Sequence, residues 1–215
     1  ELEKRGLRFV RYADDCLIMV GSERSARRVM KSVTTFIENK LGLIVNAEKS
    51  RIAKPKDIKF LGFGYYYDTK EKKYQVKPHQ LSLNKFKRNL KRLTKRNWSI
   101  SLTNRLIKIK QVVVGWINYF RIGKMKRAMR EIDEKLRART RIIIWKQWKV
   151  PKKQIKSLQQ LGVDIESAKG LTFCRKGYQY IGHSWVVQRA ISNKRLEKRG
   201  LASALNHYLK VNTVI

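Results

Sequence analysis

The sequence has little cysteine, little proline and few acidic residues. Cys16 and Cys174 are its only cysteines, which excludes a disulfide framework and a cysteine-rich zinc site. No apolar run approaches the ~20 residues needed to span a bilayer, and no secretory signal, internal repeat or low-complexity segment is evident. We therefore expect a cytoplasmic protein with no membrane-spanning segment.

Acidic residues are not only scarce but also unevenly placed. The chain carries 16 of them against 51 Lys and Arg, a formal net charge of +35. Positions 72–130 contain 18 Lys and Arg and no carboxylate. Solvated helix faces usually interleave both signs. The imbalance predicts a polyanionic partner, most commonly nucleic acid, with an anionic membrane surface as the rival.

Two adjacent carboxylates, Asp14 and Asp15, lie between two apolar stretches near the start of the chain. Residues 7–11 and 16–20 fit strands, the second of them buried, and Tyr12-Ala13-Asp14-Asp15 between them fits a hairpin tip. Carboxylates held over an apolar floor are costly unless they are neutralised. Two Mg²⁺ ions would neutralise them, because hard cations take oxygen ligands. The alternative is that both are solvated turn residues.

The remaining pattern predicts an α+β segment followed by helices. A helix capped by Ser22 and ending at Gly42 should pack its apolar stripe on the sheet, and strands are expected at 43–46, 49–54, 59–67 and 73–77. Three amphipathic helices, at about 83–98, 102–122 and 124–149, predict a three-helix bundle. Residues 151–215 form a short α-rich basic extension, with mixed strand and loop at 172–187.

Four motifs occur in an order that points to a known family. Tyr12-Ala13-Asp14-Asp15, then GLIVNAEKS at 42–50, then KFLGFG at 59–64 resemble the second half of a reverse-transcriptase palm, specifically that of group II intron-encoded proteins, the maturases. GWINYFRIG at 115–123 is similar to the signature of their maturase-specific region, which contains the thumb. The resemblance covers about residues 7–150. It implies an antiparallel palm sheet with a packed helix in 1–78, a thumb in 79–150 and an extension in 151–215.

The resemblance implies an RNA-directed DNA polymerase of a mobile element, a nucleotidyltransferase in which Asp14 and Asp15 are catalytic and hold two Mg²⁺ ions (Mn²⁺ is possible). It assigns seven residues to the primer and template: Tyr12, Ala13, Asn46, Lys49, Lys59, Gly62 and Gly64. It also places a basic thumb helix against the minor groove of the duplex, with the side chains of Lys85, Lys87, Arg88, Lys91, Arg92, Lys95 and Arg96.

The partners implied are group II intron RNA, an RNA template–DNA primer duplex, a deoxynucleoside triphosphate and target DNA, without a membrane. The setting implied is a ribonucleoprotein that associates with the nucleoid during insertion. Polymerase palms of this kind also need a third carboxylate from an earlier strand and a fingers region that holds the incoming nucleotide. Both would precede Glu1, so we expect a fragment that binds nucleic acid but does not polymerise alone. The scattered His79, His183 and His207 and the single late cysteine indicate that the family's endonuclease module is absent.

Two other functions stay open at this point. The protein could be a splicing cofactor that clamps intron RNA, with polymerisation secondary or lost. It could also be a structural RNA-binding protein unrelated to polymerases, although this leaves the carboxylate pair unexplained.

Overall fold

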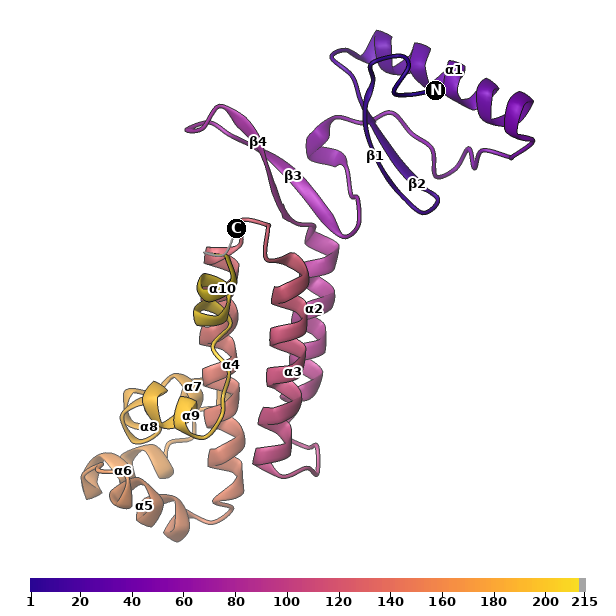
Figure 1. Ribbon diagram of the computed structural model, residues 1–215. Coiled ribbons are helices and arrows are strands. Elements are labelled where there is room, and N and C mark those ends of the chain that lie inside the picture. Colours follow the sequence, from indigo (N-terminus) through magenta and orange to yellow (C-terminus); the bar gives the residue numbers. More distant parts are fainter. Residues whose placement is uncertain (213–215) are drawn as a thin grey trace.

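The computed structural model describes residues 1–212 and is α+β, as the sequence predicts. Two antiparallel hairpins come first, and helices follow (Figure 1). Strand β1 (Arg8–Tyr12) pairs with β2 (Asp15–Met19), and β3 (Phe63–Asp68) pairs with β4 (Lys73–Pro78). Within residues 1–212 these pairs are two separate two-stranded sheets, so the single palm sheet expected from the sequence is not formed.

Helix α1 (Glu23–Leu41) has the predicted ends. The Ser22 hydroxyl accepts a hydrogen bond of 3.2 Å from the Ser25 N–H, and Gly42 ends the helix in the left-handed conformation. Its packing differs from the prediction, because no residue of α1 is buried. Strand β2 is not buried either, since Met19 is 48% exposed.

The strands expected at 43–46 and 49–54 are absent. The chain there forms a turn, in which the Asn46 Oδ1 accepts from the Lys49 N–H at 3.0 Å, and then the short 3-10 helix η1 (Pro55–Asp57). Ile44 is 95% exposed. The β-branched composition of this segment favoured strands, but β-propensity expresses itself only against a pairing partner, and the segment has none within the described residues.

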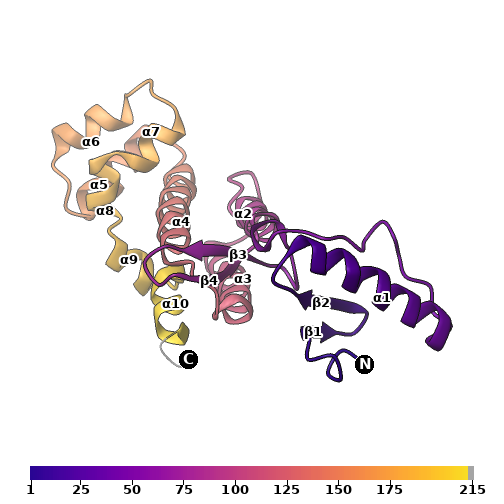
Figure 2. The ribbon, with the colours of Figure 1, turned by 90° about the horizontal axis from the view of Figure 1, so that it is seen from above.

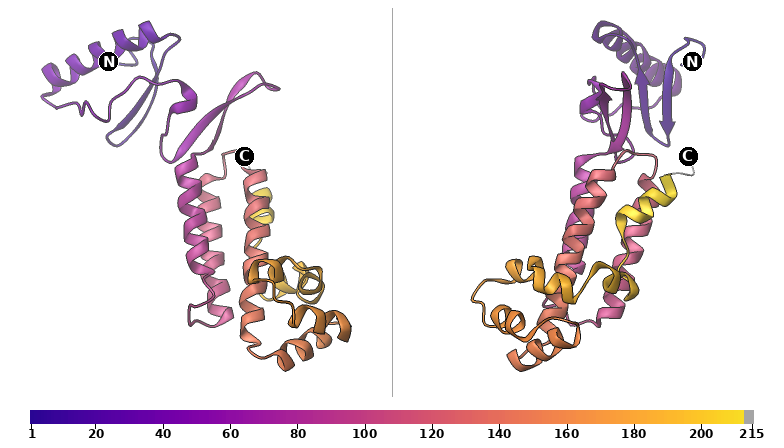
Figure 3. Two further views of the ribbon diagram at one scale, coloured as in Figure 1. Left: turned by 180° about the vertical axis from the view of Figure 1, so that it is seen from behind. Right: turned by 90° about the vertical axis from the view of Figure 1, so that its left-hand side faces the viewer.

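Three long helices follow as predicted: α2 (Gln80–Leu93), α3 (Leu102–Phe120) and α4 (Lys126–Gln147). Their apolar stripes form the core, with Phe86, Ile109 and Met129 nearly inaccessible to solvent. The packing is not a closed bundle of three. Helix α10 (Ala204–Asn212), from the C-terminal extension, packs against both α3 and α4 (Figures 1 and 3).

The described part of the extension consists of short helices joined by turns and loops, among them the loop at 173–177, so the strand expected within 172–187 is wrong. Its other helices are α5 (Pro151–Gln160), α6 (Ile165–Thr172), α7 (Tyr178–His183), α8 (Trp185–Ala190) and α9 (Asn193–Lys198). The Ser184 hydroxyl accepts from the Val187 N–H and starts α8. Helix α7 packs on α4. In Figure 2, α5 to α8 and the β1–β2–α1 part lie at opposite ends, with α2 to α4 between them.

Burial divides the chain sharply. Among residues 1–85 only Gly64 and Pro78 are buried, whereas the apolar core runs from Phe86 to Tyr208. The helical part therefore has a core of its own, and the segment from β1 to α1 contributes no buried side chain to it.

Candidate nucleic-acid interface

The predicted carboxylate pair lies at the tip of the β1–β2 hairpin. Tyr12 pairs with Asp15 in the last rung of the ladder, so Ala13 and Asp14 form a two-residue turn. Ala13 has a φ of 50°, and the Arg11 Nε donates to its carbonyl oxygen at 3.0 Å. A residue with positive φ is what such a short hairpin turn requires. The local sequence thus holds two consecutive carboxylates at an exposed tip.

Both carboxylates are open to solvent, as is Tyr12, which is 64% exposed. The apolar floor expected beneath the pair is therefore not formed. Because both carboxylates are exposed to water, they do not need a cation to offset a cost of burial. Carboxylate oxygens remain the ligands that Mg²⁺ prefers. Within residues 1–212, no cluster of three or more His, Cys, Asp or Glu side chains is placed to hold a metal. The pair therefore offers only two of the carboxylates that a metal site would need, and no third acidic side chain among residues 1–212 is placed beside it.

The Lys59–Gly64 segment makes a second tight turn. Phe60 and Phe63 exchange backbone hydrogen bonds of 3.0 and 2.8 Å, and Leu61 and Gly62 between them have φ values of 49° and 80°. Glycine suits position 62 because its φ of 80° is strained for other residues and because a Cβ there would crowd the Phe120 Cζ at 3.1 Å. The close approach that this glycine permits in the structure is to a helix of the same chain.

The basic side chains predicted for the thumb lie along α2 and the loop after it. All are exposed except Lys87, which is half-buried and lies 4.0 Å from Glu131. The predicted helix is shortened, since α2 ends at Leu93 and leaves Lys95 and Arg96 in the loop. The opposite face of α2 buries Phe86 and Leu90 in the core. One face of this helix is therefore packed, and the other presents cations with little acidic compensation.

The α2–α3 loop is held by a residue that sequence reasoning missed. Arg105 is 2% exposed and donates to the carbonyl oxygens of Leu93, Lys95 and Trp98 at 2.7–2.8 Å. Its guanidinium also lies 5.0 Å from the centre of the Trp98 ring, and burial lowers its pKa. The available signal was an arginine on the apolar stripe of α3, four residues before Ile109. Burying such a residue is costly unless acceptors surround it; here both terminal nitrogens have acceptors, whereas Nε is buried without a hydrogen-bond partner.

Arg139 of α4 braces the same loop from the other side. Its guanidinium donates to the carbonyl oxygens of Lys91 and Thr94, each at 3.2 Å, and also bonds to the Thr94 hydroxyl. Burial lowers the pKa of Arg139, and the nearby Arg96 adds to this effect. Arg96 itself lies 4.2 Å from the centre of the Tyr178 ring. The basic loop is thus fixed on α3, α4 and the C-terminal extension together.

The structure brings some predicted site residues together and leaves others apart. The Lys59–Gly64 turn is bonded directly to α2, which carries most of the basic thumb residues. Asn46 has a structural role in its own turn, and Lys49 is exposed beside it. The Asp14–Asp15 tip belongs to a separate hairpin. Within residues 1–212, none of the helices combines the length and apolar character that crossing a membrane requires.

Comparisons with known proteins agree with this division of the chain. Residues 1–65, from the first hairpin to the start of β3, match the family described as reverse transcriptase (RNA-dependent DNA polymerase). The chain thus contains part of a reverse-transcriptase domain. Residues 83–162, most of α2 through the turn after α5, match the group II intron maturase-specific domain. Together the two matches support an intron-encoded reverse transcriptase/maturase.

A curated relative supports the same family. The chain is 33% identical over 75 residues to the COX1/OXI3 intron 2 protein of Saccharomyces cerevisiae. This match covers 34% of the present chain but only 8% of that protein.

Proposed function

We propose that this chain is part of an RNA-directed DNA polymerase of a group II intron, which transfers nucleotides onto a primer 3′-hydroxyl and also binds intron RNA to assist its splicing. The observation that carries this proposal is the Asp14–Asp15 pair at the exposed tip of a two-residue hairpin, inside the segment that matches the reverse-transcriptase family. An exposed tip leaves both carboxylates accessible to a substrate approaching from solvent.

The cofactor proposed is Mg²⁺, with Mn²⁺ as a possible substitute, and Asp14 and Asp15 would contribute ligands. A metal held there would supply activation of the primer 3′-oxygen and stabilisation of the leaving pyrophosphate. The side chains around the pair have the remaining task of positioning, because phosphoryl transfer asks little covalent chemistry of a protein. With two carboxylates and no completed cluster in the described residues, this chain alone should bind nucleic acid without polymerising.

The proposed partners follow from the charge. All four proposed partners are negatively charged. Three are polyanions, namely intron RNA, the RNA template–DNA primer duplex and target DNA, and the fourth is a small anion, the deoxynucleoside triphosphate. The acid-free basic face of α2 and its loop suits an A-form duplex, which proteins recognise through its shape and backbone. We place the working complex in a ribonucleoprotein.

The test is primer extension on an RNA template by the full-length protein with Asp14→Asn. Loss of one acidic ligand should abolish synthesis and leave RNA affinity within about twofold, since affinity comes from the cations. Glu38→Gln, at an exposed position of α1, is the matched control and should synthesise normally. Retained synthesis in Asp14→Asn would refute the metal assignment.

A second function, a splicing cofactor without significant polymerase activity, is favoured by the maturase-specific match over α2 to α5. Its test is RNA binding at several salt concentrations. Neutralising Lys85, Arg88 and Arg92 with Gln should reduce the salt slope by about 2–3, because each phosphate contact contributes roughly 0.7–0.9. The control is the same change at three exposed lysines of α5: Lys152, Lys153 and Lys156. Equal losses in both sets would mean that α2 has no special role. Salt-sensitive binding without DNA synthesis, from unmodified protein, would favour this second function.

A further inference from the structure

The turn at Phe60–Phe63 is fastened to the helical region through the carbonyl groups at its tip. The Tyr119 hydroxyl, on α3, donates to the Leu61 carbonyl oxygen at 3.0 Å. The Ser82 hydroxyl, on α2, donates to the Gly62 carbonyl oxygen at 2.9 Å. Both central carbonyls of the turn are therefore held by side chains from two different helices.

Ring packing and close contact reinforce these two bonds. The Phe63 ring stacks on Tyr119, with ring centres 5.9 Å apart and planes 20° apart, and lies 4.9 Å from Phe120. The His79 N–H, at the start of α2, donates to the Gly62 carbonyl oxygen at 2.9 Å. The turn cannot shift relative to α2 and α3 without breaking several of these contacts at once.

The residues around this turn carry positive charge toward solvent. Lys59 is exposed and directly precedes the turn, and Lys85, one helical turn after Ser82, is exposed on α2. Because the turn is bonded to Ser82, the backbone positions of Lys59 and Lys85 are held relative to each other. A nucleic-acid strand bound by Lys85 would meet Lys59 at a constant position along its backbone.

We propose that Ser82 and Tyr119 are positioning residues, which hold the Phe60–Phe63 turn on α2 and α3 so that Lys59 meets the bound primer strand at one fixed place. This inference rests on the proposed function, because it takes the ligand of the turn to be a primer–template duplex. Neither hydroxyl needs to touch the nucleic acid. Their effect passes through the backbone of Leu61 and Gly62.

The experiment maps where position 59 contacts the primer. The full-length protein carries the photocrosslinker p-benzoylphenylalanine in place of Lys59, with Asp14→Asn to prevent synthesis, and is bound to a 5′-labelled DNA primer on an RNA template. The turn is released by Ser82→Ala combined with Tyr119→Phe, which removes the two hydroxyls and keeps the ring. Ser82→Thr retains a hydroxyl and is the conservative variant. Tyr67→Phe is the control, because that ring packs on Tyr74 in the β3–β4 hairpin.

In the parent, the control and the Ser82→Thr variant, crosslinks should fall on about one or two adjacent nucleotides, because a fixed group reacts at one place. In the double variant they should spread over several nucleotides, while the dissociation constant for primer–template stays within about twofold, since the cations are unchanged. If the two hydroxyls only stabilised the fold, the double variant would have a lower melting temperature and a lower affinity. The protein that still bound the duplex would then crosslink to the same one or two nucleotides as the parent.

An unchanged pattern in the double variant overturns the inference, and so does the absence of primer crosslinks in every variant. The proposed function is judged separately by synthesis with native Asp14. If synthesis occurs and position 59 never crosslinks, the function stands and the positioning role is refuted. If no synthesis occurs but the double variant still spreads the crosslinks, the polymerase proposal fails and the positioning role is supported.

Discussion

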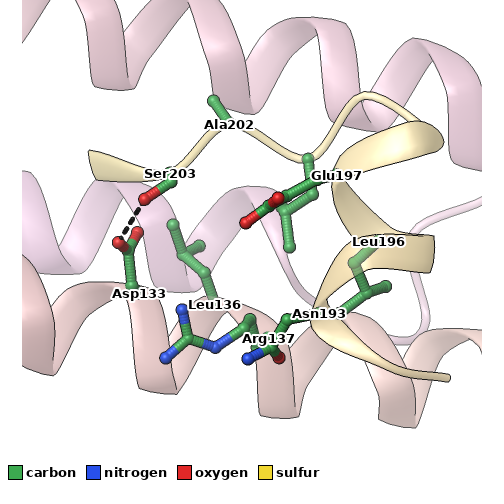
Figure 4. A pocket seen from close by; sticks show the side chains of 9 residues that line it. Asp133, Leu136, Arg137, Asn193, Leu196, Glu197, Ala202 and Ser203 are labelled. Atoms are coloured by element: carbon green, nitrogen blue, oxygen red, sulfur yellow. Dashed lines mark hydrogen bonds between the residues drawn. The ribbon is translucent and has the colours of Figure 1, made fainter. Parts of the chain in front are cut away.

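The Asp133 carboxylate accepts a hydrogen bond of 2.7 Å from the Ser203 hydroxyl, which joins α4 to the start of α10 across 70 residues of sequence (Figure 4). The same carboxylate accepts from the N–H groups of Ala204 and Leu205 at 2.6 and 3.0 Å. A cavity of only about 10 Å³ lies beside it, lined in part by Leu136 and Leu201. Asp133 is thus a buried cap for α10 and fastens the end of the described chain to the helical core.

Replacing this cap should weaken the fold. Asp133→Ala leaves one buried and one partly buried backbone N–H group of α10 without acceptors, so the free energy of unfolding should fall by about 2–4 kcal/mol. Ser203→Ala removes one hydroxyl only and should cost about 1 kcal/mol. Urea unfolding measures both changes, with Glu134→Ala, an exposed neighbour on α4, as control. Equal stability of the Asp133 and Glu134 variants would contradict the capping role.

Arg105 should matter more than any exposed cation of α3. Arg105→Met keeps most of the side-chain volume but leaves the carbonyl oxygens of Leu93, Lys95 and Trp98 without this donor, and the expected loss is about 2–4 kcal/mol. Lys108→Met, at an exposed position of the same helix, should change stability by less than about 0.5 kcal/mol. The pair is compared by urea unfolding. Hydrogen exchange in the α2–α3 loop should rise only in the Arg105 variant.

His79 makes the stability of α2 depend on pH. Its Nδ1 accepts from the Leu81 N–H at 3.2 Å, and burial, followed by the charges of Lys59 and Lys77, lowers its pKa from the ordinary value of 6.5. The neutral ring is therefore favoured in the folded state. The free energy of unfolding should be constant above pH 6.5 and should fall as the pH drops through this value toward the folded pKa.

The measurement is urea unfolding between pH 8 and 5, compared with His79→Asn. Asparagine can also cap a helix and does not titrate, so this variant should show a smaller decline below pH 6.5, with part of the remainder coming from His207, whose pKa is also lowered by burial. The same decline in both proteins would assign the effect to other groups.

Glu71 adds a second pH dependence in a lower range. The Lys124 Nζ donates to its carboxylate at 2.5 Å, and this bond, with the one from Lys73, lowers the pKa of Glu71 to about 2. The stabilisation is present above the ordinary pKa of 4.5 and should be lost as the pH falls from 4.5 to about 2. The difference in melting temperature between the parent and Glu71→Gln should shrink over this range. The difference should also shrink in 1 M salt, since the pair is exposed. A difference in melting temperature that changes with neither pH nor salt would exclude the ion pair as its source.

Local signals predicted most of the helices, and contacts distant in sequence account for the errors. Ser101 and Gly42 set helix ends through bonds to residues a few positions away, so their roles can be read from the chain. Arg105 lies on an apolar stripe, yet its acceptors belong to a loop whose course the sequence does not give. The return of α10 to α4 depends on Asp133, which looks like an ordinary surface acid.

The candidate site divides in the same way. A hairpin tip at 12–15 follows from the spacing of the flanking apolar stretches, and the structure narrows it to Ala13 and Asp14. A glycine at 62 predicts close approach of another group, but only the structure identifies that group as Phe120. The stripe of α1 was predicted correctly as a face, but periodicity cannot say how deeply a face is buried, and here it is not buried.

Gly182 lies where α7 packs so closely on α4 that a larger side chain has no room. A Cβ at this position of α7 would lie 2.7 and 2.8 Å from the Cγ1 and Cδ1 of Ile142 and 3.0 Å from the Ala138 carbonyl oxygen. Gly182→Ala should therefore force α7 away from α4 and lower the free energy of unfolding by about 1–3 kcal/mol. Gly115 is the matched control, because it lies within α3 with no atom within 4 Å of the added Cβ. There the same substitution should stabilise by about 0.5–1 kcal/mol through helix propensity.

A double-mutant cycle with Ile142→Ala, followed by urea unfolding, identifies the contact responsible. Ile142→Ala should cost stability by opening a cavity, but it removes both side-chain carbons that oppose the new methyl group. Gly182→Ala should then cost less in that background, with a coupling of about 0.5–3 kcal/mol. Strict additivity would mean that the Ala138 carbonyl oxygen, which no side-chain change can move, sets the limit on how closely α7 approaches α4.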